Sequence, residues 1–559
     1  MMNGTKAFLE LLRGAGVRYL FGNPGHTELP MLDALAGIPE MDYILGLNEA
    51  VAMAMADGYA MASGRLGVFC SHITPGFGNA LGMLYDASKT GAPLLVTAGQ
   101  QDSRFSLSEP ALWGDLVGLA RPLTKWAYQV EQIGDLTRAM RRAIKVATTP
   151  PTGPVFLSLP SDALREEAEF DLTPPTLVGS RFRGDRDTIL RVCDLLLQSQ
   201  APVIVAGDAV GKSGAEAELQ RLAELLGCPV YSEPSSNTFN FQTDHPLYQG
   251  TLARTQKGVR DVLEHFDLLF AVGADLITMA TYAKLEPIPD KLRLIQLHSD
   301  AWQLGKNYPT EALILGDPKA TLAEMVEEIR RRSDRSEHWI SERKARFAQR
   351  RSEALAAMDR QVAEESGRTP MASSVLMKTL IEHAPEHGII VDESQTAGMT
   401  LRTCLLRRTL GYFGLKGGGL GWGLPASVGV QFAHPERPVL ALLGDGSSMY
   451  TIQGLWTAAH YRRKVVFIIC NNRQYRIVKH RLHLYGGQAA KHRKYLGVEL
   501  RDPAIDFVSL GQSMGVWSAR IERPDQVADG LREAMKREGP ALLDIAVEGS
   551  YPETQSASK

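Results

Sequence analysis

At 559 residues, the chain is long enough for about three domains of ~150 to 200 residues each, with ample apolar core. Its 61 basic and 63 acidic residues leave a formal net charge of −2, so no global field favours nucleic acid or an anionic membrane. The five cysteines are scattered without a paired motif, the N-terminus lacks a signal-peptide layout, and no uncharged apolar run approaches ~18 residues. We therefore expect a cytoplasmic protein that binds no nucleic acid and no membrane, and whose partners are small molecules or copies of itself.

Residues 1–180 alternate helix and strand patterns, which predicts an α/β domain with a mostly parallel sheet. Glu49 follows the strand-like 43–47 and begins an apolar helix, where the helix dipole alone would favour a glutamate. His26 lies in a Gly/Pro turn after the first strand, and His72 follows another strand. Loop histidines are usually solvated, but both could lie at the carboxyl edge of the sheet, where ligands bind.

Residues 181–345 repeat the alternation of helix and strand patterns, which predicts a smaller central α/β domain. The stretch AGDAVGKSGAE (206–216) contains GKS after a strand, but only three residues separate Gly207 from Gly211, whereas a phosphate loop requires four. A turn before a helix is expected there. The charged tract 318–366 interleaves arginines with Glu and Asp, so we expect a solvated helical link to the third domain.

Residues 346–559 form a third predicted α/β domain, which contains the most specific motif. The apolar strand 439–444 ends in Gly-Asp-Gly-Ser-Ser (444–448), and a helix and the strand VVFIIC follow before Asn471-Asn472. Because adjacent parallel strands joined by a crossover helix end at the same sheet edge, Asp445 and Asn472 should lie close together. Their oxygens suit Mg²⁺, and the glycines, hydroxyls and helix N-terminus suit a diphosphate.

Gly-Asp-Gly followed after about 25 residues by Asn-Asn resembles the cofactor motif of thiamine-diphosphate-dependent decarboxylases and carboligases. The resemblance covers nearly the whole chain. It implies three doubly wound, mostly parallel α/β domains, which are pyrimidine-binding (1–180), central (181–345) and diphosphate/Mg-binding (346–559). It also implies that Asp445, Asn472 and the carbonyl of Gln474 bind Mg²⁺. The implied cofactor-binding residues are Gly25, Thr396, Gly419, Leu420, Gly444, Gly446, Ser447, Ser448 and Tyr475.

The resemblance also assigns catalytic roles in the first domain. Glu49 takes the position of the glutamate that shares a proton with the cofactor's aminopyrimidine. His72, with Gly78-Asn79-Ala80 after it, is similar to the active-site histidine of benzoylformate decarboxylases. Two departures concern the pocket, because His26 stands where those enzymes have serine and Ala280 where they have a second catalytic histidine. We expect proton relay through His26 and His72.

The expected activity is non-oxidative decarboxylation of a benzoylformate-like 2-oxo acid to an aldehyde, with carboligation to 2-hydroxy ketones as a further outcome. Family precedent places the cofactor between two chains, which implies a homodimer or homotetramer. After the asparagine pair, Ile477, Lys479, His480 and Arg481 replace apolar and aromatic pocket residues of the relatives. Cationic groups there favour a substrate with an acidic or coenzyme A-like tail, although a solvated helix face accounts for them equally well.

Three alternatives remain open. An acetolactate-synthase-like carboligase or an acyl-CoA-type lyase of the same family would also use these cofactors; acetolactate synthases usually bind FAD, which we do not expect here, and lack a histidine at the His72 position. An NAD-dependent dehydrogenase is the distant alternative, because GWGLPA (421–426) matches a dinucleotide fingerprint with Asp445 about 20 residues on. A non-catalytic family member is disfavoured by the presence of Glu49, Asp445 and Asn472.

Overall fold

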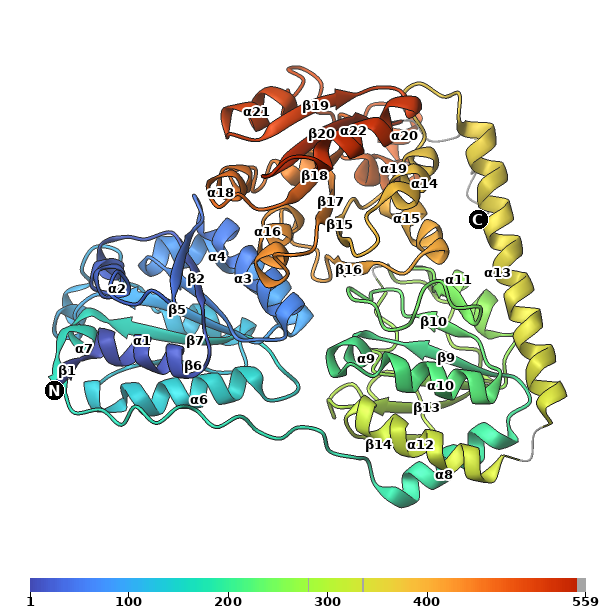
Figure 1. Ribbon diagram of the computed structural model, residues 1–559, viewed down its shortest axis with the longest axis horizontal. Coiled ribbons are helices and arrows are strands. Elements are labelled where there is room, and N and C mark those ends of the chain that lie inside the picture. The colour runs from blue at the N-terminus through green and yellow to red at the C-terminus, as the bar shows by residue number, and fades with distance from the viewer. Residues whose placement is uncertain (280, 334–335, 550–559) are drawn as a thin grey trace.

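Three six-stranded sheets, in which every neighbouring pair of strands is parallel, organise the chain in the computed structural model, which describes residues 1–279, 281–333 and 336–549 (Figure 1). The first sheet has the order β3-β2-β4-β5-β7-β6. Its strands are Asp42–Leu45, Tyr19–Gly22, Gly67–Ser71, Leu94–Gln100, Val155–Pro160 and Ala127–Gln129. A short antiparallel pair, β1 (Met2–Asn3) with β8 (Glu167–Ala168), lies beside it.

The other two sheets repeat this architecture. The second sheet has the order β11-β10-β9-β12-β13-β14, with strands Tyr248–Thr251, Val230–Ser232, Pro202–Ala206, Leu268–Val272, Arg293–His298 and Ala312–Leu315. The third has the order β16-β15-β17-β18-β20-β19, with strands Gly411–Gly414, Ile389–Glu393, Val439–Gly444, Val465–Asn471, Ala541–Ala546 and Trp517–Ile521. The prediction of three α/β domains with parallel sheets is confirmed.

Helices flank each sheet, as crossover connections between parallel strands require. The first domain contains α1 (Gly4–Gly14), α2 (Leu29–Leu35), α3 (Glu49–Ser63), α4 (Ile73–Thr90), α5 (Leu116–Ala120), α6 (Leu136–Thr148) and α7 (Ser161–Arg165). The central domain contains α8 (Arg186–Gln198), α9 (Asp208–Ser213), α10 (Glu216–Leu226), α11 (Gln256–Leu263) and α12 (Pro318–Arg332). After α13 (Glu337–Glu365), the third domain contains α14 (Ser373–His383), α15 (Gly398–Cys404), α16 (Gly423–Ala433), α17 (Asp445–Ser448), α18 (Gly454–His460), α19 (Arg476–Tyr485), α20 (Gln488–Lys491), α21 (Phe507–Ser513) and α22 (Val527–Met535).

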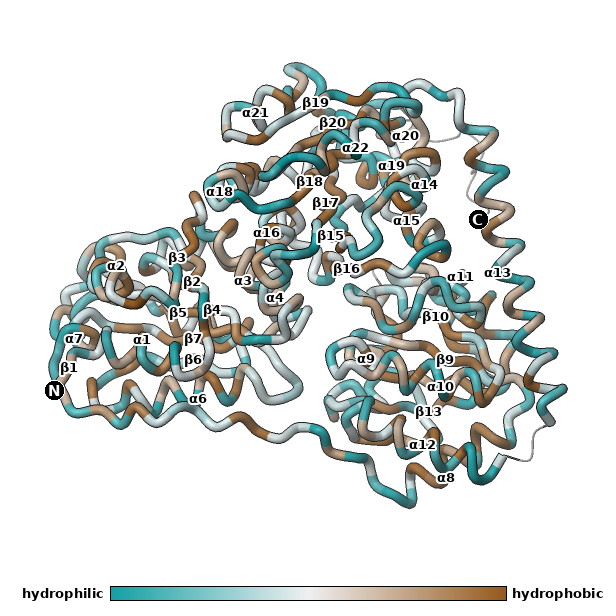
Figure 2. The backbone as a smooth tube through the Cα atoms, viewed as in Figure 1, coloured by the Kyte–Doolittle hydropathy of each residue, from teal (hydrophilic) through white to brown (hydrophobic). Residues whose placement is uncertain are grey.

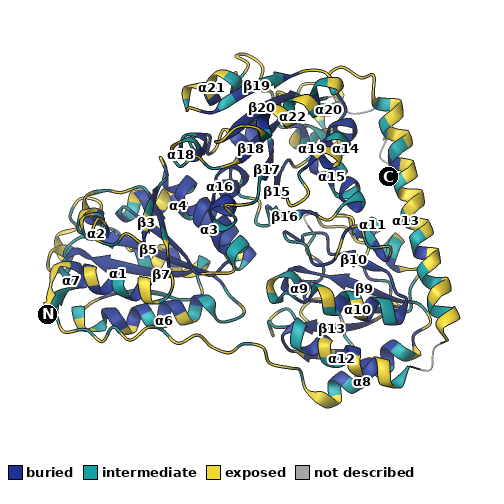
Figure 3. Ribbon diagram, viewed as in Figure 1, coloured by how far each residue is buried: buried dark blue, intermediate teal, exposed yellow. Residues whose placement is uncertain are grey.

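The strands form because their sequences are short apolar runs that are buried on both faces, as parallel sheets covered by helices require. Figure 2 shows apolar colour concentrated in the strands and on the inner helix faces, and Figure 3 shows the same segments as buried. The charged tract 318–366 differs from the single solvated link that its composition predicts. Helix α12 buries Leu322 and Met325 in the central core, whereas α13 is largely exposed. The predicted domain boundary at residues 345/346 falls inside α13.

Helix α3 connects the first and third domains by packing directly against α16 (Figure 1). Its N-cap is Asn48, whose side-chain oxygen accepts from the Ala50 N–H (2.8 Å) and satisfies an end group of the helix. Small residues allow the two helices to approach closely. A Cβ on Gly429 would lie 2.0 Å from the carbonyl oxygen of Met55, and one on Gly58 would lie 2.3 Å from that of Ala426.

Substituting Gly429→Ala should destabilise the folded chain by about 1–3 kcal/mol, because the added methyl group overlaps the backbone of α3. Chemical denaturation followed by circular dichroism measures the change. Gly539→Ala is the matched control, since a Cβ there has no neighbouring atom within 4 Å. Equal stability of the two variants would contradict the close α3–α16 contact.

A buried carboxylate, Asp57, lies in the same interface. The indole N–H of the fully buried Trp422 donates to Asp57 Oδ2 (2.7 Å), and the Thr90 hydroxyl donates to Oδ1 (3.1 Å). Burial raises the pKa of Asp57 to about 7, although both hydrogen bonds and the positive charge of Lys212 act in the opposite direction. The protonated form is therefore favoured in the folded state over a pH range in which the unfolded chain has lost the proton.

The stabilising effect of this proton should decline as the pH rises from about 4, the ordinary pKa of an aspartate, to about 7. Asp57→Asn takes up no such proton. The free energy of unfolding of the wild-type chain, relative to that of Asp57→Asn, should consequently fall by up to about 1.4 kcal/mol for each pH unit between pH 5 and pH 7. Urea titrations of both proteins at pH 5, 6 and 7 measure this difference, and parallel pH profiles would refute it.

Candidate active site

The predicted metal-binding residues lie together at the carboxyl edge of the third sheet. Strands β17 and β18 are paired, so Asp445, which begins α17, lies next to the turn containing Asn472. The backbone N–H of Gln474 is within 3.3 Å of Asp445 Oδ2 and 3.1 Å of Asn472 Oδ1. Two oxygens from separate strands thus converge on one point, as the strand pattern predicts.

The donor set at this point fits Mg²⁺ and a diphosphate. Asp445 is buried, which raises its pKa to about 6 against the opposing backbone N–H groups of Gly446, Arg473, Gln474 and Asn472. A bound cation would offset this cost of burying the charge. Within the described part of the chain, no group of three or more His, Cys, Asp or Glu side chains could hold a metal. A metal here would therefore bind one carboxylate, amide and carbonyl oxygens, and phosphate, which is the set that suits Mg²⁺.

The loops around this edge are packed closely against one another. A Cβ on Gly446 would lie 2.4 Å from the ring of Tyr475, and the hydroxyls of Ser447 and Ser448 both donate to the Gly444 carbonyl. The carbonyl of Gln474 accepts from the Arg476 N–H (2.9 Å), which leaves its second lone pair for a metal. Thr396 lies between β15 and α15 at the same sheet edge.

The run GGGLGWG (417–423), here called the glycine segment, lies beside these loops. The Thr451 hydroxyl donates to the Gly421 carbonyl (2.5 Å), and a Cβ on Gly421 would lie 2.5 Å from the side chain of Tyr450. Tyr450 and Thr451 follow α17, so the segment that contains Gly419 and Leu420 is held next to the Asp445 loop. That it passes near the cofactor stays a prediction.

The predicted catalytic residues of the first domain form a separate group. Glu49 is the buried first residue of α3, and the Asn79 amide of α4 donates to its Oε2 (3.0 Å). A Cβ on Gly76 would lie 2.6 Å from Glu49 Oε1, so a glycine keeps that oxygen accessible. His72 occupies the N-cap position of α4 without a side-chain capping bond. Its ring is perpendicular to that of His26, with the two ring centroids 6.5 Å apart.

Glu28 is a functional candidate that the sequence patterns did not single out. It is buried, and it accepts from the Gly25 N–H (2.9 Å), from the Thr27 hydroxyl (2.6 Å) and, through Oε2, from His72 Nδ1 (3.0 Å). Because an ionised carboxylate only accepts hydrogen bonds, this contact favours the His72 tautomer with its proton on Nδ1, and Nε2 is then the nitrogen that can exchange a proton. A Cβ on Gly25 would lie 2.2 Å from the His72 ring, so this glycine makes room for the pair. The sequence shows a glutamate two residues after His26, but neither its burial nor its contact with His72.

The two groups lie in different halves of the chain. Across the described residues, no hydrogen bond or ion pair connects Glu49, His26 or His72 with 444–448 or 472–475. In the predicted pocket helix α19, Ile477 is partly buried and Arg481 is exposed, whereas Lys479 bonds to Gln474 Oε1 (3.0 Å) and Glu499 (3.3 Å). Ala280 lies outside the described residues.

Three family models match the chain in the order of its domains. They are the thiamine pyrophosphate enzyme N-terminal TPP-binding domain (residues 2–115), the central domain (189–325) and the C-terminal TPP-binding domain (396–545). The chain is 32% identical to benzoylformate decarboxylase of Pseudomonas aeruginosa, over 98% of this chain and 99% of that protein. It belongs to the thiamine pyrophosphate enzymes.

Within this family the chain resembles both decarboxylases and synthases. A probable acetolactate synthase large subunit of Methanocaldococcus jannaschii is 29% identical over 98% of this chain and 92% of its own length. The solved structure of a 4-hydroxybenzoylformate decarboxylase of Rhodococcus jostii superposes with a TM-score of 0.86 at 29% identity, covering 98% of this chain and 99% of that one. The dinucleotide interpretation of 421–426 is accordingly set aside. No helix in the described residues is long and apolar enough to cross a membrane.

Proposed function

We propose that this chain is a thiamine-diphosphate- and Mg²⁺-dependent lyase that decarboxylates a benzoylformate-like 2-oxo acid to an aldehyde, with carboligation to 2-hydroxy ketones as a second outcome. The observation that carries the proposal is the His72–Glu28 pair beside His26 and Glu49. It supplies imidazoles for proton transfer in the domain that supplies the activating glutamate. The full-length similarity to benzoylformate decarboxylase supports the same choice.

When bound, thiamine diphosphate supplies the carbon nucleophile and the electron sink for decarboxylation. Asp445, Asn472 and the Gln474 carbonyl would hold the Mg²⁺, with the N–H groups of the Gly444–Ser448 loop facing the diphosphate. Glu49 would hold a proton at Oε1, the oxygen that Gly76 leaves accessible. Because Glu28 fixes the His72 tautomer, Nε2 of His72 can deliver a proton to the product carbon or accept one from a substrate hydroxyl.

The separation of the two groups supports a homodimer or homotetramer whose active site lies between chains. One copy would then contribute Glu49 and the histidines, and its partner the metal loops. All five cysteines are buried free thiols, which supports a reducing compartment such as the cytoplasm. An acetolactate-synthase-like carboligase remains the second candidate, because full-length similarity to such synthases is nearly as high.

Release of CO₂ from benzoylformate and from pyruvate, with and without thiamine diphosphate and Mg²⁺, tests the substrate class. We expect turnover of benzoylformate that requires both cofactors and is lost when EDTA removes the metal. Turnover of pyruvate alone, by a yellow protein, would replace the decarboxylase proposal with the carboligase. Inactivity with both acids would contradict the benzoylformate-like assignment.

Glu49→Gln should reduce turnover by at least about 100-fold, in the range for loss of a general acid–base group, while thiamine diphosphate still binds through the metal loops. Asp445→Asn should instead weaken cofactor binding. Steady-state kinetics and calorimetric titration separate the two effects, and near-normal turnover of Glu49→Gln would remove its proposed role.

Co-expression of these two inactive variants tests the position of the active site. In a mixed dimer, an inter-chain arrangement gives one site with both substitutions and one site with neither. Activity should therefore reappear in the mixed dimers. Absence of activity in purified mixed dimers would contradict a site shared between chains.

A further inference from the structure

We propose that Asp86 is a positioning residue, whose carboxylate fixes the glycine segment and thereby holds Leu420 against the cofactor. This inference rests on the proposed thiamine diphosphate site. Asp86 lies near the end of α4, in the first domain, whereas the glycine segment belongs to the third. Asp86 Oδ1 accepts from the Gly419 N–H (3.1 Å), and the aspartate is fully buried.

The segment has no side chains of its own where Asp86 contacts it. A Cβ on Gly417 would lie 2.1 Å from Asp86 Oδ1, and one on Gly419 would lie 2.3 Å from Oδ2. The carboxylate therefore occupies the space that side chains would fill. Among the described residues, Asp86 Oδ2 is buried without a hydrogen-bond partner, so the carboxyl group is retained at a cost in desolvation.

Two further buried carboxylates hold the remainder of the segment. Glu393, at the end of β15, accepts from the N–H groups of Gly421 and Gly423 at 2.6 Å each. The Trp422 indole donates to Asp57 on α3. Four N–H donors of residues 419–423 are thus directed at three buried acids from two domains.

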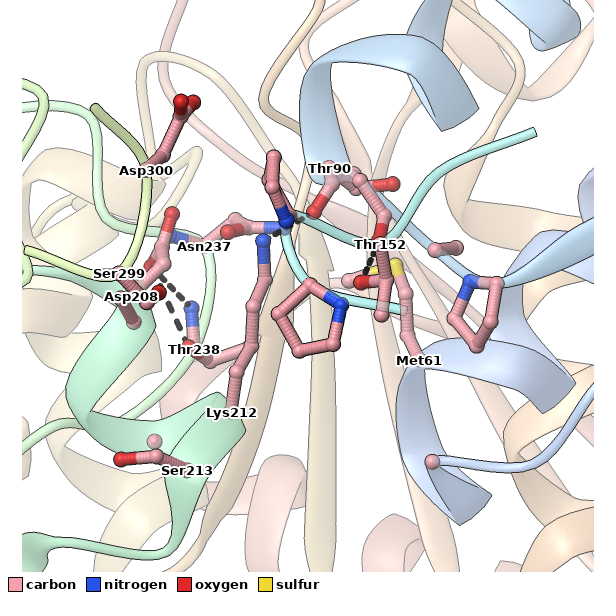
Figure 4. Close-up of a pocket in the computed structure, with 18 of the residues that line it drawn as sticks. Met61, Thr90, Thr152, Asp208, Lys212, Ser213, Asn237, Thr238, Ser299 and Asp300 are labelled. Atoms are coloured by element: carbon pink, nitrogen blue, oxygen red, sulfur yellow. Dashed lines mark hydrogen bonds between the residues drawn. The ribbon is translucent and has the colours of Figure 1, made fainter. Parts of the chain in front are cut away.

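The start of the segment is fixed by the central domain. Lys416, the preceding residue, forms ion pairs with Asp208 (2.7 Å) and Asp275 (2.8 Å). These groups line a cavity of about 490 Å³ where the three domains meet. Figure 4 shows Lys212 of α9 reaching across this cavity to Thr90, whose carbonyl accepts from its ammonium group. All three domains therefore contact the residues around the glycine segment.

External bonds are needed because the segment cannot fix its own conformation. It contains five glycines in seven residues, of which Gly418 and Gly421 have φ values of +93° and +95°. Glycine loses more conformational freedom on folding than any other residue, so a free segment of this composition would be mobile. Ordering it before the cofactor arrives lowers the entropy cost of binding.

The helices that carry these acids also carry the catalytic glutamate. Helix α3 has Glu49 at its start and Asp57 about two turns later, and α4 has Asn79, which bonds to Glu49, about two turns before Asp86. The two helices are in direct contact. In the proposed site between chains, a shift of Asp86 would therefore change the glycine segment of one site and the scaffold that orients Glu49 for the other.

Calorimetric titration of the full-length chain, freed of cofactor and metal, with thiamine diphosphate at saturating Mg²⁺ tests the proposal. Asp86→Ala should raise the Kd at least tenfold, because the Gly419 N–H loses its acceptor. Asp86→Asn should stay within about threefold of the wild type, since an amide oxygen accepts from the same N–H. Asp506→Ala is the control: it removes the side-chain cap of α21 in the same domain and should leave the Kd unchanged.

A wild-type Kd for Asp86→Ala, or equal losses in the Ala and Asn variants, would overturn the role of Asp86 as a positioning acceptor. If Asp86→Ala does not fold, Thr451→Val tests whether bonds to the glycine segment affect cofactor binding. This substitution removes the bond to the Gly421 carbonyl while keeping the shape of the side chain. A Kd raised about threefold would support the proposal, and an unchanged Kd would overturn it. Failure of the wild-type chain to bind thiamine diphosphate at all would instead refute the proposed function.

Discussion

The direct contact between α3 and α16 is the constraint on which the candidate site depends. Helix α3 is buried from Glu49 to Ala60 because it lies between the first sheet and the third domain. Two glycines, Gly58 and Gly429, make this spacing possible by removing side chains where the backbones meet. The contact fixes the glycine segment that leads into α16 relative to the first domain of the same chain. In the proposed site between chains, Glu49 of this chain would then serve the other site of the dimer.

Buried carboxylates are the second recurring feature of this interface. Burial raises the pKa of Asp57 and Asp86 to about 7 and that of Glu393 to about 8. Each accepts at least one hydrogen bond from the segment 419–423, which partly offsets the cost of burial. Asp445 is also buried, and its oxygens face backbone N–H groups of the turn that contains Asn472. The same physical cost therefore recurs at the residue that we propose as a metal ligand.

The sequence was sufficient for the parts of the fold and site that depend on local pattern. Apolar runs separated by helical stretches predict three parallel sheets, and the glycines around Asp445 with the asparagine pair predict the edge where Gln474 N–H meets both side chains. The contributions of Glu28, Asp86 and Glu393 could not be predicted in this way. Each is a single acidic residue in a turn, helix or strand, and its significance depends on a partner in a different element. The prediction of a solvated link over 318–366 was wrong in part for the same reason, because α12 buries one face against the central core, which the composition of the tract does not reveal.

The histidines are the main difference that we expect between this chain and benzoylformate decarboxylases. The resemblance places His26 where those enzymes have serine, and its ring lies at right angles to that of His72 within the first domain. Glu28 and Thr27 hold the His72 ring from behind, so its free nitrogen faces away from them. With alanine at position 280, both imidazoles would come from the domain that carries Glu49. Proton delivery would then depend on one domain rather than on its alignment with the central one.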